Sequence, residues 1–290
     1  MAESAHDAPS VLTPRLTIVC PLCQQPLDRA PRTWTCPNRH SFDVAREGYI
    51  NLLPVQQKAS KDPGDSAESL AARRAFLNAG HYQPLRSAVL AMLKPLRAET
   101  LLDIGCGEGW YTSAFPDIAS DIIGLDIAKP AVRMAAKAYA PIACPEITWI
   151  VGSGAALPVE EASLDVITCL FTQLHVDEMH RALRVGGHVL VVTPAPDHLW
   201  SLRAGLFDDV QPHAPDKFIA SFGERFDRVD RVDVRAELAL TGDQLRALLA
   251  MTPYVWKAKP ERRAALERRA ALATNAAFSL LLFRKRLGDG

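Results

Sequence analysis

The sequence predicts a doubly wound α/β domain preceded by a small module that a metal ion holds together. Two observations support this prediction. From residue 100 onward, short apolar runs alternate with helical segments, and the first run ends at a glycine-rich turn. Upstream, three cysteines and a histidine follow one another at the spacing C-x2-C-x12-C-x3-H. Alternating strands and helices favour a mostly parallel sheet that is covered on both faces.

Composition places the chain among globular proteins. Its 290 residues are 48% hydrophobic, which is enough for one large domain and a small one. The formal net charge is zero and gives no global reason to expect a nucleic-acid partner. No run approaches the ~20 apolar residues of a membrane span, and the N-terminus lacks the order of a signal peptide. We therefore expect a cytoplasmic protein with no membrane partner.

The first predicted element is the metal module, residues 18–50, which follows a small, polar tail (1–17) that we expect to be disordered. Thiolate and imidazole are ligands that Zn2+ prefers, and four of them close a tetrahedral site without room for substrate. A chance cluster of reduced cysteines is the alternative, but half of the six cysteines fall within this module. So small a module needs the metal for stability, so the zinc is expected to be structural. The predicted ligands are Cys20, Cys23, Cys36 and His40.

Residues 51–83 are predicted to form a linker and a helix. A polar run with proline and glycine covers residues 58–65, and a helical period follows over residues 66–79. The main domain, residues 84–290, then begins with a helix over residues 84–96. Its expected strands are 101–104, 122–125, 147–151, 165–171, 188–192 and 278–283. Its further expected helices are 131–139, 176–184 and 243–251.

The turn after the first strand is predicted to bind a cofactor. Residues 103–109 read Asp-Ile-Gly-Cys-Gly-Glu-Gly, and the glycines let the backbone approach a ligand closely. Alone the pattern is weak, because ordinary turns also use glycine. Two further positions are in register, since Asp126 ends the second strand and Gly-Ser-Gly-Ala-Ala-Leu-Pro occupies residues 152–158. A carboxylate such as Asp126 can accept two hydrogen bonds from a vicinal diol.

This glycine spacing resembles motif I of class I S-adenosylmethionine methyltransferases. In that family the loop accommodates the methionine part of the cofactor, the acid after the second strand binds the ribose, and the loop after the third strand reads the adenine. The resemblance implies a Rossmann-like, seven-stranded core. Ser153 stands where that third loop often carries an aspartate, which weakens the expected contact with the adenine amino group.

A closer resemblance runs from about residue 18 to residue 257. The runs Cys-Pro-Leu-Cys-Gln-Gln-Pro-Leu, Glu-Gly-Tyr-Ile-Asn-Leu-Leu-Pro-Val and Ala-Arg-Arg-Ala-Phe-Leu-Asn-Ala-Gly-His-Tyr are similar to those of RlmA-type 23S rRNA (guanine-N1)-methyltransferases. That resemblance implies that the zinc module helps to grip an rRNA hairpin, and that the core methylates one guanine of domain II at N1. It also implies a homodimer. The expected partners are thus 23S rRNA and a second copy of the chain.

The resemblance also extends the set of cofactor contacts. It adds Tyr82 and His198, for which the sequence alone suggests only packing, and it supports Gly107 and Glu108 in the glycine loop. The expected cofactor-binding residues are Tyr82, Asp103, Gly105, Gly107, Glu108, Asp126, Ser153 and His198.

The catalytic residues stay open at this point. Guanine N1 lies on the Watson–Crick edge, so the base must be unpaired or extruded before it reacts. N1 also carries a proton, which requires a general base or stabilisation of a developing O6 anion. No spacing selects among the candidates Asp177, Glu178, His175 and His198. Relatives carry a Tyr-Ala-Pro-Cys type segment after the fourth strand, where this chain has Phe-Thr-Gln-Leu from Phe171, a ring that could still stack on the target base.

Two alternative functions remain open. A small-molecule methyltransferase could use the same core, but it would not need the zinc module. A non-catalytic zinc-ribbon RNA-binding protein would be expected to have lost motif residues, yet Asp103, the three glycines and Asp126 are present. The basic stretch 257–286 carries nine Lys or Arg against two Glu, and it suits a solvated face and a phosphate-contacting face equally.

Overall fold

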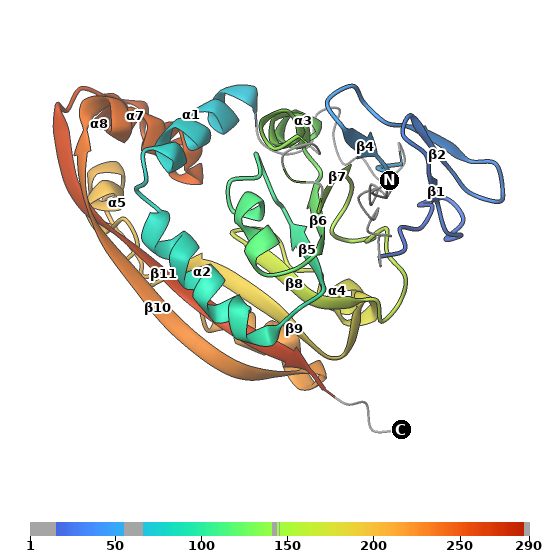
Figure 1. Cartoon of the computed structure of the whole chain (residues 1–290). Helices are drawn as coiled ribbons and strands as arrows, with labels where there is room; N and C mark the ends of the chain where they lie inside the picture. The colour runs from blue at the N-terminus through green and yellow to red at the C-terminus, as the bar shows by residue number, and fades with distance from the viewer. Residues whose placement is uncertain (1–15, 55–65, 141–143, 145, 287–290) are drawn as a thin grey trace, which may run out of the picture.

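The protein combines one large α/β body with a small three-stranded sheet at one end (Figure 1). The predicted linker run 58–65 and the predicted tail up to residue 15 lie outside the described residues. A computed structural model describes residues 16–54, 66–140, 144 and 146–286.

The strands form two sheets. The small sheet has the order β1-β2-β3, and the large sheet has the order β10-β11-β9-β8-β5-β6-β7-β4. Pairings from β4 through β9 are parallel, whereas β11 runs antiparallel to both β9 and β10. The strands are β1 Asp28–Arg29, β2 Thr33–Thr35, β3 Ser41–Asp43, β4 Tyr49–Asn51, β5 Thr100–Ile104, β6 Asp121–Asp126, β7 Ile147–Val151, β8 Leu164–Leu170, β9 Leu183–Pro194, β10 Phe226–Thr241 and β11 Ala271–Lys285.

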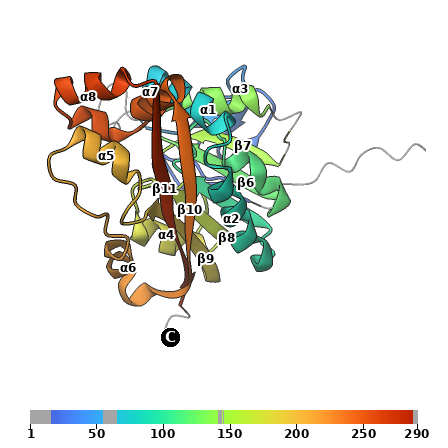
Figure 2. The ribbon, with the colours of Figure 1, turned by 90° about the vertical axis from the view of Figure 1, so that its left-hand side faces the viewer.

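Helices cover both faces of the large sheet. Because successive strand residues point to opposite faces, Leu101 packs in the same cluster as α2 and α3, and Leu102 packs in the cluster that includes α4 and α6. Figure 2 faces the β10–β11 edge, with α2 and α6 on opposite sides of it. The α-helices are α1 Ala67–Asn78, α2 Gln83–Leu93, α3 Lys129–Ala138, α4 Val176–Ala182, α5 Trp200–Leu206, α6 Lys217–Phe222, α7 Gly242–Met251 and α8 Pro260–Glu267. The 3-10 helices are η2 Lys94–Leu96, η3 Thr112–Asp117, η4 Gly223–Arg225 and η5 Pro253–Trp256.

The predicted seven-stranded core is confirmed as strands β5 to β11. An eighth strand, β4, extends it: β4 lies at the end of the predicted zinc module and pairs in parallel with β7. The last residues of that module therefore belong to the large sheet, so the chain passes from the ribbon directly into the core.

Three details differ from the sequence expectation. The sequence does not predict β10, because Asp and Arg residues interrupt its apolar residues and so hide a 16-residue strand that pairs along β11. Phe171 was expected within a strand, but β8 ends one residue earlier and Phe171 adopts a left-handed backbone with φ of 59°. Leu183 begins β9 rather than continuing α4, since its backbone is extended.

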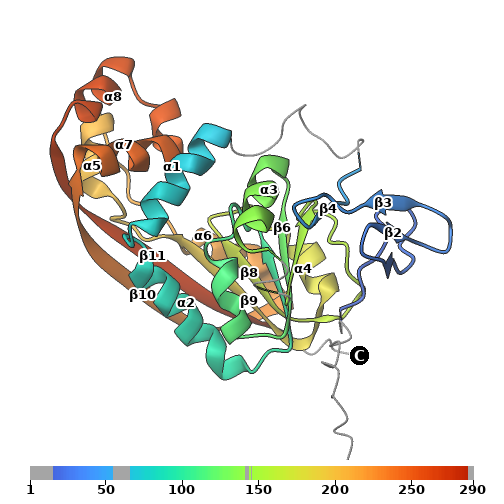
Figure 3. The same ribbon diagram turned by 45° about the horizontal axis from the view of Figure 1, so that its top comes forward.

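The small sheet packs against the face that carries α4 and α6. Leu16, the first described residue, is buried there, and its N–H donates to Asp121 Oδ2 over 2.8 Å. Val19 N–H donates to the carbonyl of Pro158 over 2.9 Å. Figures 1 and 3 show this sheet at the opposite end of the molecule from α7 and α8. None of the described helices is long and apolar enough to cross a membrane.

Candidate functional site

The four predicted zinc ligands come together beside the small sheet. Their ligand atoms all lie within 4.8 Å of one another. Cys23 Sγ lies 3.6 Å from Cys36 Sγ, and His40 Nδ1 lies 3.5 Å from Cys20 Sγ and 3.4 Å from Cys36 Sγ. A tetrahedral zinc ion with bonds of ~2.3 Å to sulfur and ~2.0 Å to nitrogen separates its ligand atoms by about 3.5 to 3.8 Å. The donor set and its spacing therefore fit zinc.

Two tight turns hold these ligands. The turn after Cys20 closes with a hydrogen bond of 2.8 Å from Gln24 N–H to the Cys20 carbonyl, and the turn after Cys36 closes in the same way through Arg39. Gln24 and Arg39 both have positive φ angles, 59° and 64°. A backbone N–H of Gln25 lowers the pKa of the Cys23 thiol to about 6, whereas burial raises the pKa of Cys20 to about 11. Four filled positions leave no open coordination site, so the zinc is structural.

A cavity of about 910 Å³ opens where β5, β6, β8 and β9 end. Ligands of open α/β sheets bind at these carboxyl ends, and the volume lies within the ~300–1,000 Å³ of small-molecule sites. All eight predicted cofactor residues line it: Tyr82, Asp103, Gly105, Gly107, Glu108, Asp126, Ser153 and His198.

The glycine loop forms one wall of the cavity. Gly105 has φ of +71°, and a Cβ at this position would lie 2.6 Å from Thr172 Oγ1. Gly107 has φ of +57°, and the nearest atom to a Cβ there would be Nη1 of Arg73, at 3.5 Å. Gly105 is therefore required for packing, whereas Gly107 leaves space on the cavity side for a ligand.

Asp103 ties the glycine loop to the sheet. The carboxylate is buried, and the hydroxyls of Thr112 and Thr168 donate to its two oxygens over 2.6 Å and 2.7 Å. Burial nevertheless raises the pKa of Asp103 to about 6. Because the two threonines come from η3 and β8, this carboxylate fixes the floor of the cavity.

Asp126 lies at the end of β6 and is only half-buried. Gly107 N–H donates to its Oδ2 over 2.9 Å, and Ala128 N–H donates to its Oδ1 over 2.8 Å. A carboxylate offers about four acceptor positions, and these two backbone N–H groups use one on each oxygen. The geometry is therefore compatible with the predicted ribose contact.

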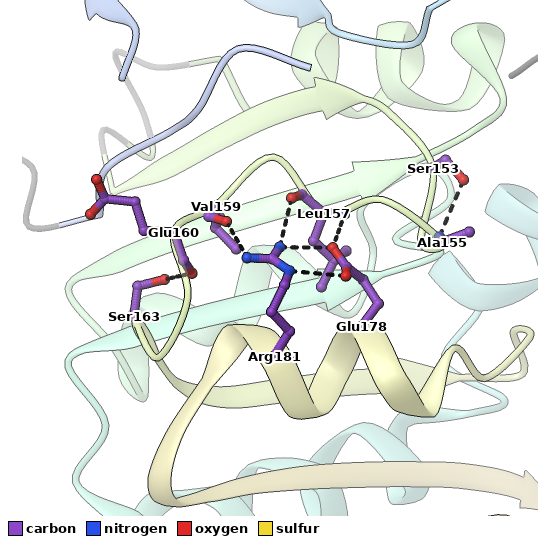
Figure 4. Close-up of polar contacts among 8 residues, drawn as sticks. All are labelled: Ser153, Ala155, Leu157, Val159, Glu160, Ser163, Glu178 and Arg181. Atoms are coloured by element: carbon purple, nitrogen blue, oxygen red, sulfur yellow. Dashed lines mark hydrogen bonds and ion pairs between the residues drawn. The ribbon is translucent and has the colours of Figure 1, made fainter. Parts of the chain in front are cut away.

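The loop after β7 is held by α4 (Figure 4). Leu157 N–H donates to Glu178 Oε1 over 2.7 Å, and Arg181 donates both to Glu178 and to the Leu157 carbonyl. The hydroxyl of Ser153 accepts a hydrogen bond of 3.2 Å from the backbone N–H two residues further on. Glu178 thus stabilises the predicted adenine loop, and the Ser153 side chain helps to shape it.

Only two of the four candidate bases line the cavity that the described residues form. Asp177 is exposed and pairs with Arg225, and Glu178 is engaged with Arg181. His175 and His198 do line the cavity. The structure therefore narrows the choice to the two histidines.

The surroundings of each histidine determine its protonation. Ala277 N–H donates to Nδ1 of His198 over 3.2 Å, so the neutral ring of His198 has its proton on Nε2. Burial lowers the pKa of His198 to about 3, which keeps this ring a neutral donor near pH 7. Burial also lowers the pKa of His175, so this ring too is neutral near pH 7, with one unprotonated nitrogen.

An aromatic wall contains the two residues that only the family resemblance suggested. The rings of Tyr82 and His198 lie 4.9 Å and 4.8 Å from the ring of Phe278. Sequence reasoning missed other lining residues, although some lie in runs that carry the resemblance. They are Arg73, Tyr111, His213, Lys217, Tyr254 and Trp256.

Known proteins match the chain in both of its parts. A sequence model described as "RlmA, N-terminal", a zinc ribbon, matches residues 18–61, and a methyltransferase-domain model matches residues 102–191. Over 272 residues the chain is 36% identical to a "Putative 23S rRNA (guanine-N(1)-)-methyltransferase" of Micromonospora griseorubida, which covers 85% of this chain and 89% of that protein. The chain belongs to the 23S rRNA (guanine-N1)-methyltransferase family. A second family member, the 23S rRNA (guanine(748)-N(1))-methyltransferase of Streptomyces fradiae, is 34% identical over 253 residues, or 84% of this chain and 88% of that one.

As a class I member of this family, the methyltransferase uses S-adenosylmethionine and a structural zinc ion. The cavity fits the cofactor in two respects beyond its volume. Gly107 leaves the glycine wall open, and the buried hydroxyl of Tyr111 has no hydrogen-bond partner among the described atoms. A buried hydroxyl without a partner is costly, so a polar ligand group at this place would satisfy it.

Proposed function

We propose that this protein transfers a methyl group from S-adenosylmethionine to N1 of a guanine in a domain II hairpin of 23S rRNA. The observation that carries the proposal is the presence, in one chain, of the complete motif cavity and of a four-ligand zinc cluster in a module that packs on the same domain. Both relatives are named as 23S rRNA (guanine-N1)-methyltransferases, and the Streptomyces fradiae protein is named for position 748. A small-molecule methyltransferase would have little use for such a module.

Bound S-adenosylmethionine supplies an electrophilic methyl group. The protein has to hold the cofactor and the base together, exclude water and remove the N1 proton. We assign the proton transfer to His175, whose neutral imidazole can accept the proton as the N1–H bond breaks. His198 keeps its own proton on Nε2 and so suits donation to an acceptor such as guanine O6.

Two exposed aromatic rings line the cavity. Phe171 is 46% exposed, lines the cavity and has a left-handed backbone that costs about 1–3 kcal/mol. Trp256 also lines the cavity and is 78% exposed. Aromatic rings stack on unpaired bases, which supports an RNA loop as substrate.

The proposal includes a homodimer that acts in the cytoplasm. The family resemblance supports the dimer, and a ribosomal RNA substrate supports the location. Light scattering of the purified protein is expected to give twice the mass of one chain, and a monomer mass at assay concentration would remove the dimer from the proposal.

Methyl transfer to rRNA tests the function directly. The purified protein with S-adenosylmethionine is incubated with 23S rRNA that lacks the modification, and the product is mapped by reverse transcription. We expect one new stop at a guanine, because a methyl group on N1 blocks base pairing. Normal cofactor binding without methyl incorporation into unmodified rRNA would sink the proposal. RNA binding in that case would favour the non-catalytic alternative.

A further inference from the structure

Helix α1, which lies outside the seven-stranded core, forms part of the wall of the cofactor cavity. Helix α1 brings Arg73 into the cavity lining, with the side chain 27% exposed. Its start is fixed by Ser66, whose hydroxyl accepts from Ser69 N–H over 3.2 Å. Arg73 Nη1 lies 3.5 Å from the position of a Cβ on Gly107. A guanidinium thus stands directly beside the open part of the glycine loop.

Glu108 places a negative charge beside this guanidinium. The Glu108 side chain is only 4% exposed, and its Oε2 lies 3.9 Å from Arg73 Nη1. This separation exceeds the ~2.8 Å of a charge-assisted hydrogen bond. Arg73 and Glu108 form an ion pair at the cavity wall.

Tyr111 adds an uncharged donor at the same place. Tyr111 lines the cavity, and its buried hydroxyl has no partner among the described atoms. The charges of Arg73 and Glu108 both act on this phenol, whose pKa is raised chiefly by burial. A cation, an anion and a phenol hydroxyl are therefore grouped next to the glycine loop.

This grouping is complementary to a zwitterionic amino acid. The methionine end of S-adenosylmethionine carries a carboxylate and an ammonium group on one carbon atom. A guanidinium recognises a carboxylate through paired N–H donors, and a buried carboxylate favours an ammonium group. A purely structural Arg73–Glu108 pair would explain the two charges, but it would leave the Tyr111 hydroxyl without a partner.

We propose that Arg73 binds the α-carboxylate of S-adenosylmethionine, that the Tyr111 hydroxyl donates to the same carboxylate, and that Glu108 accepts from the α-ammonium group. The assignment rests on the proposed function, because it concerns the cofactor of that reaction. It makes helix α1 part of the cofactor site.

Binding measurements on the full-length, zinc-loaded protein without RNA test this assignment. Calorimetry compares S-adenosylmethionine with decarboxylated S-adenosylmethionine, which lacks only the carboxylate. Arg73→Gln should weaken binding of the complete cofactor roughly 10- to 100-fold, as expected for a lost charged hydrogen bond, and change binding of the decarboxylated analogue less than about twofold. Tyr111→Phe should show the same selectivity with a smaller loss.

Two further variants separate recognition from folding. Arg74→Gln changes the next residue of α1, which is not among the residues lining the cavity, and should leave both affinities unchanged. Arg73→Lys keeps a positive charge beside Glu108 and should recover part of the affinity for the complete cofactor. An equal loss for both ligands in Arg73→Gln, or no loss at all, overturns the assignment. Wild-type protein that fails to bind the complete cofactor would instead contradict the proposed function.

Discussion

The zinc module and the methyltransferase domain are stabilised by different means. Strands β1 to β3 have only two or three residues each, whereas β9 and β10 have 12 and 16. The module buries Leu27 and Trp34, but it does so in a cluster shared with the large sheet. So few residues cannot form a core of their own, so the metal and the neighbouring domain must supply the missing stability.

The two regions are joined by backbone contacts between the zinc module and the adenine loop. Val19, next to the zinc ligand Cys20, donates to the carbonyl of Pro158, which ends the predicted adenine loop. Ile18 forms a β-bridge with Val159 beside this contact, and we call this boundary between the zinc module and the large domain the seam. If the module binds RNA as proposed, these contacts place the bound RNA at a defined position relative to the cofactor loop.

Loss of the metal should have the largest effect. Cys36→Ser removes one of four ligands, and structural zinc contributes on the order of 10 kcal/mol to folding of such modules. Hydrogen exchange should show that the amides of β2 and β3 lose protection while those of β5 and β8 keep it. RNA binding should be lost, and cofactor affinity should fall less, through the contact between Val19 and Pro158.

Cys144→Ser provides the control for this experiment, because Cys144 lies outside the cluster. It should leave zinc content and exchange unchanged. Retained protection in β2 and β3 of the zinc-free protein would show that docking alone holds the module, and simultaneous loss in β5 would show that the two regions unfold as one.

Local sequence patterns predicted the elements within each region, but not the contacts between elements. Strands β5 to β7 are short, mostly apolar runs that end at Asp or are followed by Gly, and the motif spacing identified Asp103, Gly105 and Asp126. The seam could not be predicted, because Val19 and Pro158 meet through tertiary packing without a local pattern. Arg73 was recognised as helical, but helical spacing does not tell which loop a helix covers.

The large domain contains a buried carboxyl group, that of Asp103, whose contribution to the free energy of unfolding should depend on pH. The pKa of Asp103 is about 6 in the folded protein against an ordinary 3.8, so the folded state holds this proton more tightly. Stability contributed by Asp103 is therefore full below pH 3.8 and falls as pH rises through 6. The unfolding free energy of the wild type minus that of Asp103→Asn should drop by roughly 2 kcal/mol between pH 4 and pH 7.

Urea unfolding at each pH measures this difference. Asp117→Asn changes an exposed carboxylate of the neighbouring η3 and serves as the control. A difference that increases with pH would mean that the two threonine hydroxyls outweigh burial and that Asp103 stabilises the fold as an anion.

Arg29 is expected to stabilise the contact between the zinc module and the large domain. Its guanidinium donates to Thr148 Oγ1 over 2.9 Å and lies 5.0 Å from the ring centre of Trp34. Arg29→Ala should lower the unfolding free energy of the zinc-loaded protein by about 2 kcal/mol, as expected for one charged hydrogen bond and a ring contact. Arg32→Ala, at an exposed position of the same module, should change it less than about 0.5 kcal/mol. Equal effects would mean that Arg29 does not hold the seam.

Trp256 tests whether RNA recognition extends beyond the zinc module. Trp256→Ala should lower kcat/KM for 23S rRNA about tenfold, which corresponds to one stacked base, and leave cofactor affinity unchanged. Trp256→Phe should retain much of the activity, because a smaller ring still stacks. Trp200→Ala is the matched control, since Trp200 is also exposed but is not among the lining residues. If all three variants behave alike, the RNA is recognised by the module alone. A selective loss in Trp256→Ala would mean that the hairpin contacts both the zinc module and Trp256 at the cavity. The contacts between the module and the adenine loop would then set the distance between these two RNA-binding places.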